Sequence, residues 1–312
     1  MSTILRANER VAYFNGKVVP ESEVHVSFRD RGFKYGDAVF DMTRTFGHRI
    51  FKIREHVERL YKSLKYVGID PGMAPAEMIR ISEEVLGRNL HLIGPDDDYW
   101  VGQRVSRGVD RVGGDFNERE GGPTVIVECT PLPLKARARL YRDGIDVLIP
   151  SVRRVAPDAL SARAKTHNYL NLIMGDLEAK AQDPESWAVL LDHNGNLCEG
   201  IGSNIFVIRS GELLTPSTRY VLPGVSRQTA IDMALQLGVK VTETDLDPYD
   251  AYTADEVFLT STSLCVCPVR SVNGRRIGDG GAMPGPITKA ITGAYAKSVD
   301  CDFVAQYLKH LS

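Results

Sequence analysis

The sequence has little net charge, no long apolar run and few cysteines, and each of these shortages excludes a class of protein. Its formal charge is -2 and its pI is about 6.4, so no overall basic field would attract nucleic acid. No apolar run approaches the roughly 18 residues of a membrane span, and the opening MSTILRANERVAYF lacks a basic segment followed by an apolar core. We therefore expect a cytoplasmic protein whose partner is a small molecule or another protein.

Cysteine is too sparse to form a disulfide framework. The five cysteines contain no CxxC pair, so reduced thiols are expected. Two of them alternate within the apolar run SLCVCPV, which predicts a strand with small buried side chains. Because a tetrahedral metal site would need further ligands that the sequence does not supply, no metal is expected. The cysteines are Cys129, Cys198, Cys265, Cys267 and Cys301.

Several familiar enzyme motifs are also missing. GIGSNI, which begins at Gly200, lacks the third glycine of a dinucleotide fingerprint and precedes an expected strand instead of a helix. The sequence has no GxxxxGK phosphate loop, no HExxH and no GxSxG. His167 and His193 are open candidates for ligands or bases, although single histidines more often cap or hydrogen-bond.

The composition that remains is that of a globular protein, with 43% hydrophobic and 25% charged residues. A length of 312 residues suggests two domains. The stretch TVIVECTPLPLKARARLYRDG begins as a strand and becomes rich in proline and arginine, which predicts an interdomain linker over residues 130–138. Such a linker would separate an N-terminal domain over 1–129 from a C-terminal domain over 139–312.

The first domain is predicted to open with a hairpin turning at Asn15-Gly16. From Ile53, apolar residues at steps of three and four predict an amphipathic helix whose polar face carries His56 and Arg59. A second helix is expected over 75–90 and a strand over 99–109. A glycine-rich loop is expected over 113–122.

The second domain is predicted to mix hairpins with helices. Turns at Asn194-Gly195 and Ser210-Gly211 each join two β-rich arms. Ser226 is placed to cap a helix that Gly238 would end. A further helix is expected over 166–182, and one long strand begins at residue 256 and runs toward a turn at 273–274.

Four segments make chemical sense together only around a phosphorylated, electron-withdrawing group. Lys165 precedes a helix, and Glu199 ends a strand before two glycines that would let the backbone approach a flat ligand. A helix N-terminus at Gly224, Val225 and Ser226 would cradle a phosphate. The remaining pieces are the hydroxyl cluster Thr260, Ser261, Thr262 and Ser263, and Arg59 as a cationic partner of the phosphate.

At these residues the sequence resembles the fold type IV pyridoxal-phosphate enzymes, which include branched-chain and D-amino-acid aminotransferases and aminodeoxychorismate lyase. The resemblance covers nearly the whole chain, through RGFKYGDAVFDMTRTF, HVERLYKS, AKTHNYLN, EGIGSNIF, LPGVSRQ, DEVFLTSTS and PGPITK. It implies Lys165 as the Schiff-base lysine and Glu199 as the partner of the pyridine nitrogen of pyridoxal 5'-phosphate. It also implies a cofactor shell of Arg59, Tyr169, Ser203, Asn204, Leu222, Gly224, Val225, Ser226 and Thr262.

The chemistry explains why such residues are needed. Removal of the α-proton of an amino acid creates a carbanion, which is tolerable only if the cofactor ring delocalises the charge. A carboxylate such as Glu199 would keep the pyridine nitrogen protonated, and a neutral Lys165 would act as the base.

The resemblance says less about the substrate. Tyr35, Phe40, Met42 and Arg44 are similar to the family's substrate-pocket strand, with Asp41-Met42 where branched-chain enzymes have Glu-Gly. RVSRGVDRVGG carries Arg104, Arg107 and Arg111, and Arg111 is the candidate for the substrate carboxylate, as in the D-amino-acid branch. Ser261 and Ser263 are the other candidate substrate residues.

We therefore expect a transaminase that exchanges an amino group between an amino acid, with branched-chain-like donors favoured, and a 2-oxo acid by a ping-pong mechanism. D-amino-acid or (R)-amine transamination, a lyase, and a non-catalytic pyridoxal-phosphate-binding protein are the alternatives. The fold implied by the resemblance is of the α+β class, with a small N-terminal α/β domain and a larger barrel-like C-terminal domain. The resemblance also implies that the cofactor lies at the junction of the two domains and that the protein is a homodimer.

Overall fold

The computed structural model describes residues 10–311. Residues 1–9, which include most of the opening segment discussed above, lie outside the described residues. The chain divides into two compact units. Unit 1 comprises Met1–Leu132 and Ala164–Asn168, and unit 2 comprises Pro133–Arg163 and Tyr169–Ser312.

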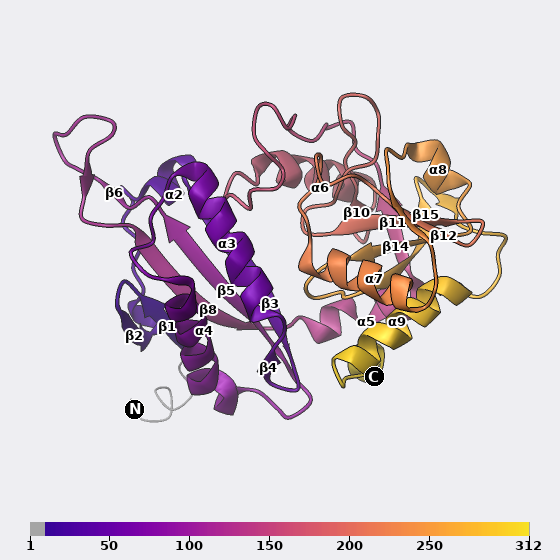
Figure 1. The fold of residues 1–312 in the computed structure, drawn as a ribbon, viewed down its shortest axis with the longest axis horizontal. Coiled ribbons are helices and arrows are strands. Elements are labelled where there is room, and N and C mark those ends of the chain that lie inside the picture. Colours follow the sequence, from indigo (N-terminus) through magenta and orange to yellow (C-terminus); the bar gives the residue numbers. More distant parts are fainter. Residues whose placement is uncertain (1–9, 312) are drawn as a thin grey trace. The chain divides into compact units, whose positions relative to one another are not determined.

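Unit 1 is built on an antiparallel sheet (Figure 1). Among the described residues its six strands follow the order β2-β1-β8-β5-β3-β4. The predicted hairpin is confirmed, because Asn15 and Gly16 take positive φ angles of 44° and 99° between the paired β1 and β2. The strands are β1 Val11–Phe14, β2 Lys17–Pro20, β3 Ala38–Phe46, β4 Arg49–Ile50, β5 Tyr99–Ser106 and β8 Thr124–Pro131.

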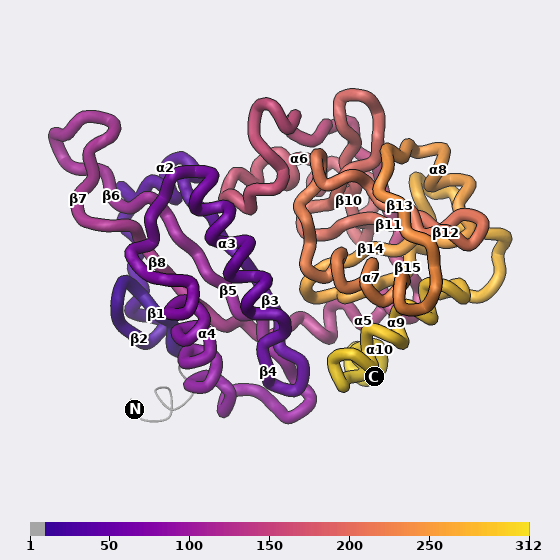
Figure 2. Tube along the Cα trace, in the orientation of Figure 1, coloured from indigo at the N-terminus to yellow at the C-terminus, as the bar shows by residue number. Residues whose placement is uncertain are grey.

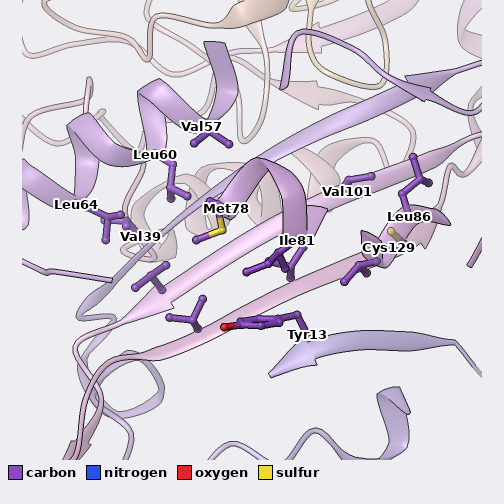
Figure 3. Packing of buried hydrophobic residues seen from close by; sticks show 14 of the residues in the cluster. Tyr13, Val39, Val57, Leu60, Leu64, Met78, Ile81, Leu86, Val101 and Cys129 are labelled. Carbon is purple, nitrogen blue, oxygen red and sulfur yellow. The ribbon is translucent and has the colours of Figure 1, made fainter. Parts of the chain in front are cut away.

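The two helices predicted for this domain are confirmed as α3 (Ile53–Val67) and α4 (Pro75–Asn89). Both cover one face of this sheet (Figure 1). Their apolar side chains meet alternate residues of the strands, since a strand turns every second side chain to the same face. Burial of each large apolar side chain stabilises the unit by about 1.5–3 kcal/mol. Figure 3 shows this core, which includes Tyr13, Val39, Val57, Leu60, Leu64, Met78, Ile81, Leu86, Val101 and Cys129.

Two expectations about unit 1 need correction. His56 and Arg59 were expected on the polar face of α3, but both are buried because the helix turns them toward a carboxylate on β3. The predicted glycine-rich loop contains β7, which pairs with β6 in a hairpin (Figure 2). The short elements of unit 1 are η1 Glu21–Glu23, α2 Arg31–Tyr35, η2 Leu90–Leu92, β6 Val109–Asp110 and β7 Arg119–Glu120.

Unit 2 contains a mixed sheet of eight strands among the described residues, in the order β10-β9-β15-β14-β11-β12-β13 with β16 beside β15 (Figure 1). The pairs β10-β9, β9-β15 and β12-β13 are parallel, and the others are antiparallel. The strands are β9 Ile145–Leu148, β10 Trp187–Ala188, β11 Asn204–Arg209, β12 Glu212–Thr215, β13 Val241–Glu243, β14 Glu256–Thr260, β15 Cys267–Val272 and β16 Arg275–Arg276.

Helices surround this second sheet, and α10 packs against α5. The predicted hairpin at Ser210-Gly211 is confirmed by the pairing of β11 with β12. Near Asn194-Gly195, a single antiparallel bridge joins Leu191 to Leu197. The helices are α5 Leu134–Asp143, α6 Leu170–Gln182, α7 Val225–Gln236, α8 Pro248–Tyr252, α9 Pro286–Ser298, α10 Phe303–Leu308 and η3 Lys309–Leu311.

Four predictions about the second domain and its boundary differ from the structure. The N-cap of α7 is Gly224, and Ser226 lies inside the first helical turn. The long strand predicted from residue 256 is two antiparallel strands, because the chain reverses at Cys265, whose φ is +56°. Residues 134–138 of the predicted linker already belong to α5. The lysine segment 164–168, which we expected in the C-terminal domain, groups with unit 1.

The thiols of Cys129, Cys198, Cys265 and Cys267 are buried, and none of the five cysteines is in a disulfide. Burial raises the pKa of Cys129 to about 12. Within residues 10–311, we find no helix that combines the length and the apolar character of a membrane span.

Candidate active site

Lys165 lies in the short segment of unit 1 that pairs with β3. Thr166 forms an antiparallel bridge with Val39, and the Lys165 carbonyl accepts a hydrogen bond of 3.0 Å from the Phe40 N–H. The Lys165 N–H donates to Ser63 Oγ of α3 over 3.0 Å. These contacts fix the backbone of the lysine, and its Nζ lies 4.5 Å from the centre of the Phe40 ring.

In unit 1, a buried carboxylate on β3 joins two residues of α3. Arg59 donates from Nε and Nη2 to the two oxygens of Asp41, each over 2.8 Å, and His56 Nδ1 lies 2.7 Å from Asp41 Oδ1. Although burial raises the pKa of Asp41, the charges of Arg59 and His56 hold it well below its usual range. Burial lowers the pKa of His56, and the charges of Arg59 and Lys165 add to this effect. Asp41 thus fixes the position of Arg59, the candidate phosphate residue.

The opposite face of β3 carries the apolar residues proposed for the substrate. Phe40 contacts the His167 ring edge-on, with the ring centres 5.2 Å apart, and the Arg104 guanidinium lies 5.5 Å from the Phe40 centre. Burial lowers the pKa of His167 to about 4. Met42 lies beside Gly102 of β5, where an added Cβ would stand 3.0 Å from Met42 Cε. Because Gly102 has no side chain, the Met42 side chain can occupy the space beside it.

The remaining substrate candidates of unit 1 have other contacts. Arg44 is 1% exposed and donates to Asp98 and to a backbone carbonyl, so we do not carry it into the proposed substrate site. Arg111 is exposed on the β6-β7 hairpin and pairs with Glu118 over 3.6 Å. Tyr35 is exposed on α2, where its ring contacts Phe116, with the ring centres 5.8 Å apart.

In unit 2, Glu199 is hydrogen-bonded to Leu222, another of the candidate cofactor residues. Its Oε1 accepts from Arg154 Nε over 2.9 Å, and its Oε2 accepts from the Leu222 N–H over 2.9 Å. Glu199 is 5% exposed, so it is held as a buried, oriented anion. The sequence predicted Glu199 and Leu222, but it gave no signal for Arg154, which lies 45 residues earlier in the chain.

Asn204 and Gly224 extend this group. Asn204 Nδ2 donates to the Leu222 carbonyl over 3.0 Å. A Cβ at Gly224 would lie 2.3 Å from Asn204 Oδ1, so only glycine fits there. Gly200 is equally constrained, since its Cβ would lie 2.6 Å from Ser203 Oγ. Within the described part of the chain, Ser203 Oγ is buried and has no hydrogen-bond partner.

The N-terminus of α7 is the candidate phosphate cradle. Gly224 is its N-cap, and Val225 and Ser226 supply N–H groups of the first turn, for which the helix itself offers no acceptor. Ser226 is 5% exposed, and its hydroxyl lies 3.5 Å from the Tyr295 hydroxyl of α9. Tyr169 is the N-cap of α6 and packs against an apolar cluster that includes Leu172.

The turn between β14 and β15 holds the hydroxyl residues of the sequence motif. Thr262 is partly exposed in this turn, and Ser261 Oγ lies 3.4 Å from Ser263 Oγ. Ser263 is 4% exposed, and Arg137 of α5 donates to its hydroxyl. Arg137 is a second residue that sequence reasoning missed, because it lies in the segment predicted as a linker.

These observations fit pyridoxal phosphate. The buried Ser203 Oγ without a partner, the glycine at 224 and the N-terminus of α7 suit a flat phosphorylated ligand. Lys165 and Arg59 in unit 1 have the chemistry to form a covalent link to an aldehyde and to bind a phosphate.

Comparisons with known proteins agree with this interpretation. The model of the class IV amino-transferases matches residues 38–272. A protein of Methanocaldococcus jannaschii, provisionally named a branched-chain-amino-acid aminotransferase, is 37% identical over 281 residues, covering 89% of this chain and 93% of that protein. A D-alanine aminotransferase of Bacillus licheniformis is 29% identical over 287 residues, with 92% and 96% coverage.

A solved structure shows the same fold. The T.th. branched-chain amino acid aminotransferase with pyridoxamine 5'-phosphate superposes with a TM-score of 0.83 at 28% identity, covering 93% of this chain and 94% of the other. The chain therefore belongs to the class IV aminotransferase family, with the fold type IV α+β architecture. It is a transaminase, and its cofactor is pyridoxal 5'-phosphate.

Proposed function

We propose that the protein transfers the amino group of a branched-chain amino acid to a 2-oxo acid. The observation that carries this proposal is the apolar face of β3, where Phe40 lies 4.5 Å from Lys165 Nζ and Met42 fills the space beside Gly102. Such a face suits an aliphatic side chain beside the reacting amine. The relative of Methanocaldococcus jannaschii supports the same substrate class.

Each candidate residue then has a defined task. When bound, pyridoxal phosphate supplies an electron sink for the charge left at the substrate's α carbon. Lys165 Nζ takes the α-proton and returns it, and its backbone contacts with Phe40 and Ser63 hold it in place for that transfer. Glu199 holds a proton on the pyridine nitrogen, since Arg154 and the Leu222 N–H keep its carboxylate buried and oriented.

For the phosphate, unit 2 offers the N-terminus of α7 and unit 1 offers Arg59. The N–H groups of Val225 and Ser226 and the positive end of the helix dipole favour an anion. Asp41 accepts two hydrogen bonds from Arg59 and thereby fixes the plane of its guanidinium. Thr262 supplies a hydroxyl from the turn after β14.

We also propose a homodimer. Helix α6 exposes an apolar stripe with the i, i+3, i+4, i+7 spacing of one helix face, and a stripe of this kind is typical of a surface that another chain covers. Its members are Leu170, Ile173, Met174 and Leu177, which are 38–70% exposed.

A donor panel tests the substrate. Purified protein loaded with pyridoxal phosphate is given L-valine, L-leucine, D-alanine or (R)-1-phenylethylamine with pyruvate or 2-oxoglutarate, and the products are quantified. We expect turnover with L-valine and L-leucine. Preference for D-alanine or for the amine would replace the proposal by the corresponding alternative, and product formed without any 2-oxo acid would indicate a lyase.

A further inference from the structure

A cavity in unit 2 lies beside the ion pair of Arg154 and Glu199. Its volume is about 230 Å³, and its lining residues come from three segments within 154–158, 192–198 and 219–220, all of unit 2. Pockets for drug-sized ligands have volumes of roughly 300–1,000 Å³, and this cavity has the volume of only about seven or eight waters. It therefore suits a small ion.

Arg154 brings unused hydrogen-bond donors to this cavity. A guanidinium has five N–H donors, and the Glu199 carboxylate takes only the one on Nε. Among the described residues, no acceptor pairs with Nη1 or Nη2, although the Arg154 side chain is only 11% exposed. Because a largely buried donor without a partner is costly, the N–H groups of Nη1 and Nη2 favour an acceptor in the cavity.

The other charged side chains of the cavity leave it short of an anion. Arg219 and His193 line it, are exposed, and form no ion pair within the described part of the chain. Asp192 is 3% exposed and accepts three hydrogen bonds from within its own turn, so its carboxylate is already satisfied there. Asp158 is exposed, and it is the other carboxylate among the described lining residues.

The bound cofactor would increase this shortage of negative charge. By the proposed function, Glu199 also faces the protonated pyridine nitrogen, so one carboxylate then lies between two cations. A second anion on Nη1 and Nη2 of Arg154 restores the alternation of charge, in the order anion, guanidinium, carboxylate and pyridinium. The planar fork of a guanidinium matches a tetrahedral oxyanion, to which it can donate two parallel hydrogen bonds.

We propose that this cavity binds a small tetrahedral oxyanion of the size of inorganic phosphate, held by Arg154 and Arg219. Because the same guanidinium orients Glu199, the anion also acts on the bound cofactor and is an effector of the transaminase. The effect on the cofactor rests on the proposed role of Glu199, whereas the site itself rests on the contacts of unit 2.

Calorimetry on the protein loaded with pyridoxal phosphate, in a buffer without phosphate, tests the site. The loaded protein is used so that the cofactor's own phosphate occupies the candidate cradle at α7. The probes are inorganic phosphate and glycerol 3-phosphate, which distinguish a free anion from the phosphate group of a larger metabolite. The variants are Arg154→Lys, Arg219→Met and Asp158→Asn. Arg276→Met is the matched control, since Arg276 is exposed on β16 and does not line this cavity.

We expect saturable binding of one phosphate per chain. Arg154→Lys keeps a charge for Glu199 but loses the fork, and Arg219→Met loses a charged donor, so each should raise the Kd about tenfold. Asp158→Asn should lower the Kd about threefold because it removes a repelling carboxylate. Arg276→Met should leave the Kd unchanged. The probe that binds more tightly identifies the source of the anion.

The effect on the cofactor has its own readout. Phosphate should change the absorbance of the bound cofactor, with the Kd that calorimetry gives and with the same order of variants. Reciprocity of linked equilibria requires this if the anion and the cofactor share Arg154 and Glu199. Binding without any change in absorbance would overturn the effector role.

Three outcomes overturn the site. The first is a loaded wild-type protein that binds neither probe, and the second is an equal change of Kd in Arg219→Met and Arg276→Met. The third is loss of phosphate binding in saturating 4-methylvalerate, which would assign the anion to the substrate's carboxylate site. A protein that turns over no donor in the panel would refute the proposed function instead and leave the calorimetric result standing, so the two failures are distinguishable.

Discussion

His167 makes the stability of unit 1 depend on pH in a direction that can be worked out. Its ring lies edge-on to Phe40, and its buried Nε2 has no hydrogen-bond partner within the described residues. Burial lowers the pKa of His167 from its ordinary value of 6.5 to about 4. Between these values the unfolded chain binds a proton that the folded chain does not, so the free energy of unfolding falls as the pH falls.

The size of this effect follows from the two pKa values. Lowering the pH from 7 to 5 should remove about 2 kcal/mol of the stability of unit 1, and the full loss near pH 4 is about 3 kcal/mol. Above pH 6.5 the contribution is fully present. His56 acts in the same direction, because burial lowers its pKa too, so the comparison must be made with a variant that lacks only His167.

The assay uses the fluorescence of Trp100, which is the tryptophan of unit 1. The second tryptophan, Trp187, lies in unit 2 and is replaced. In a Trp187→Phe background, fluorescence of Trp100 during urea unfolding reports unit 1. His167→Gln should lose less stability than its parent between pH 7 and pH 5, by about 2 kcal/mol. His25→Gln, at an exposed histidine of the same unit, should keep the parent's slope. Equal slopes for parent and His167→Gln would refute a buried, neutral His167.

Four further outcomes follow from the structure. Borohydride reduction of the protein loaded with pyridoxal phosphate should attach the cofactor to Lys165, and peptide mapping that finds it elsewhere contradicts the assignment. Glu199→Gln should retain bound cofactor, measured by absorbance, yet lower kcat about 100-fold or more; undiminished turnover would remove its role. Asp41→Asn should destabilise unit 1 by about 3–5 kcal/mol in urea unfolding because Arg59 stays buried without its anion, whereas Glu77→Gln at an exposed pair should leave the unfolding curve nearly unchanged. Leu177→Glu should shift the mass measured by light scattering from dimer to monomer, and an unchanged mass would exclude the α6 stripe as the interface.

Local sequence patterns predicted much of unit 1. The steps of three and four along α3 and the turn at Asn15-Gly16 each depend on neighbouring residues, and both are confirmed. The burial of His56 and Arg59 was not predicted, because their partner Asp41 is 15 and 18 residues away on β3. A hydropathy pattern counts a charged residue as polar and cannot see the carboxylate that compensates it.

The chain reversal after β14 shows a second limit. The alternation in SLCVCPV favours one continuous strand, yet the chain turns back at Cys265. A hydrogen bond of 2.8 Å from the Cys265 N–H to the Ser261 carbonyl closes the turn, and a positive φ at a cysteine carries no sequence signal. Periodicity reports which side chains share a face, but it does not report where the backbone leaves the sheet.

The sequence reveals a glycine that a site needs more readily than it reveals the charge partner of an arginine. Gly224 could be selected from LPGVSRQ because it stands at the start of a helix, which is a local feature of the sequence. The steric reason for a glycine there comes only from the structure, since a Cβ would stand 2.3 Å from Asn204 Oδ1 of β11. The sequence suggested Arg44 as a substrate residue and gave no signal for Arg137. Arg44 ends beside Asp98 in the core of unit 1, whereas Arg137 ends on the hydroxyl of Ser263. Which acceptor an arginine reaches depends on distant residues that the fold brings to it, and a sequence pattern does not report them.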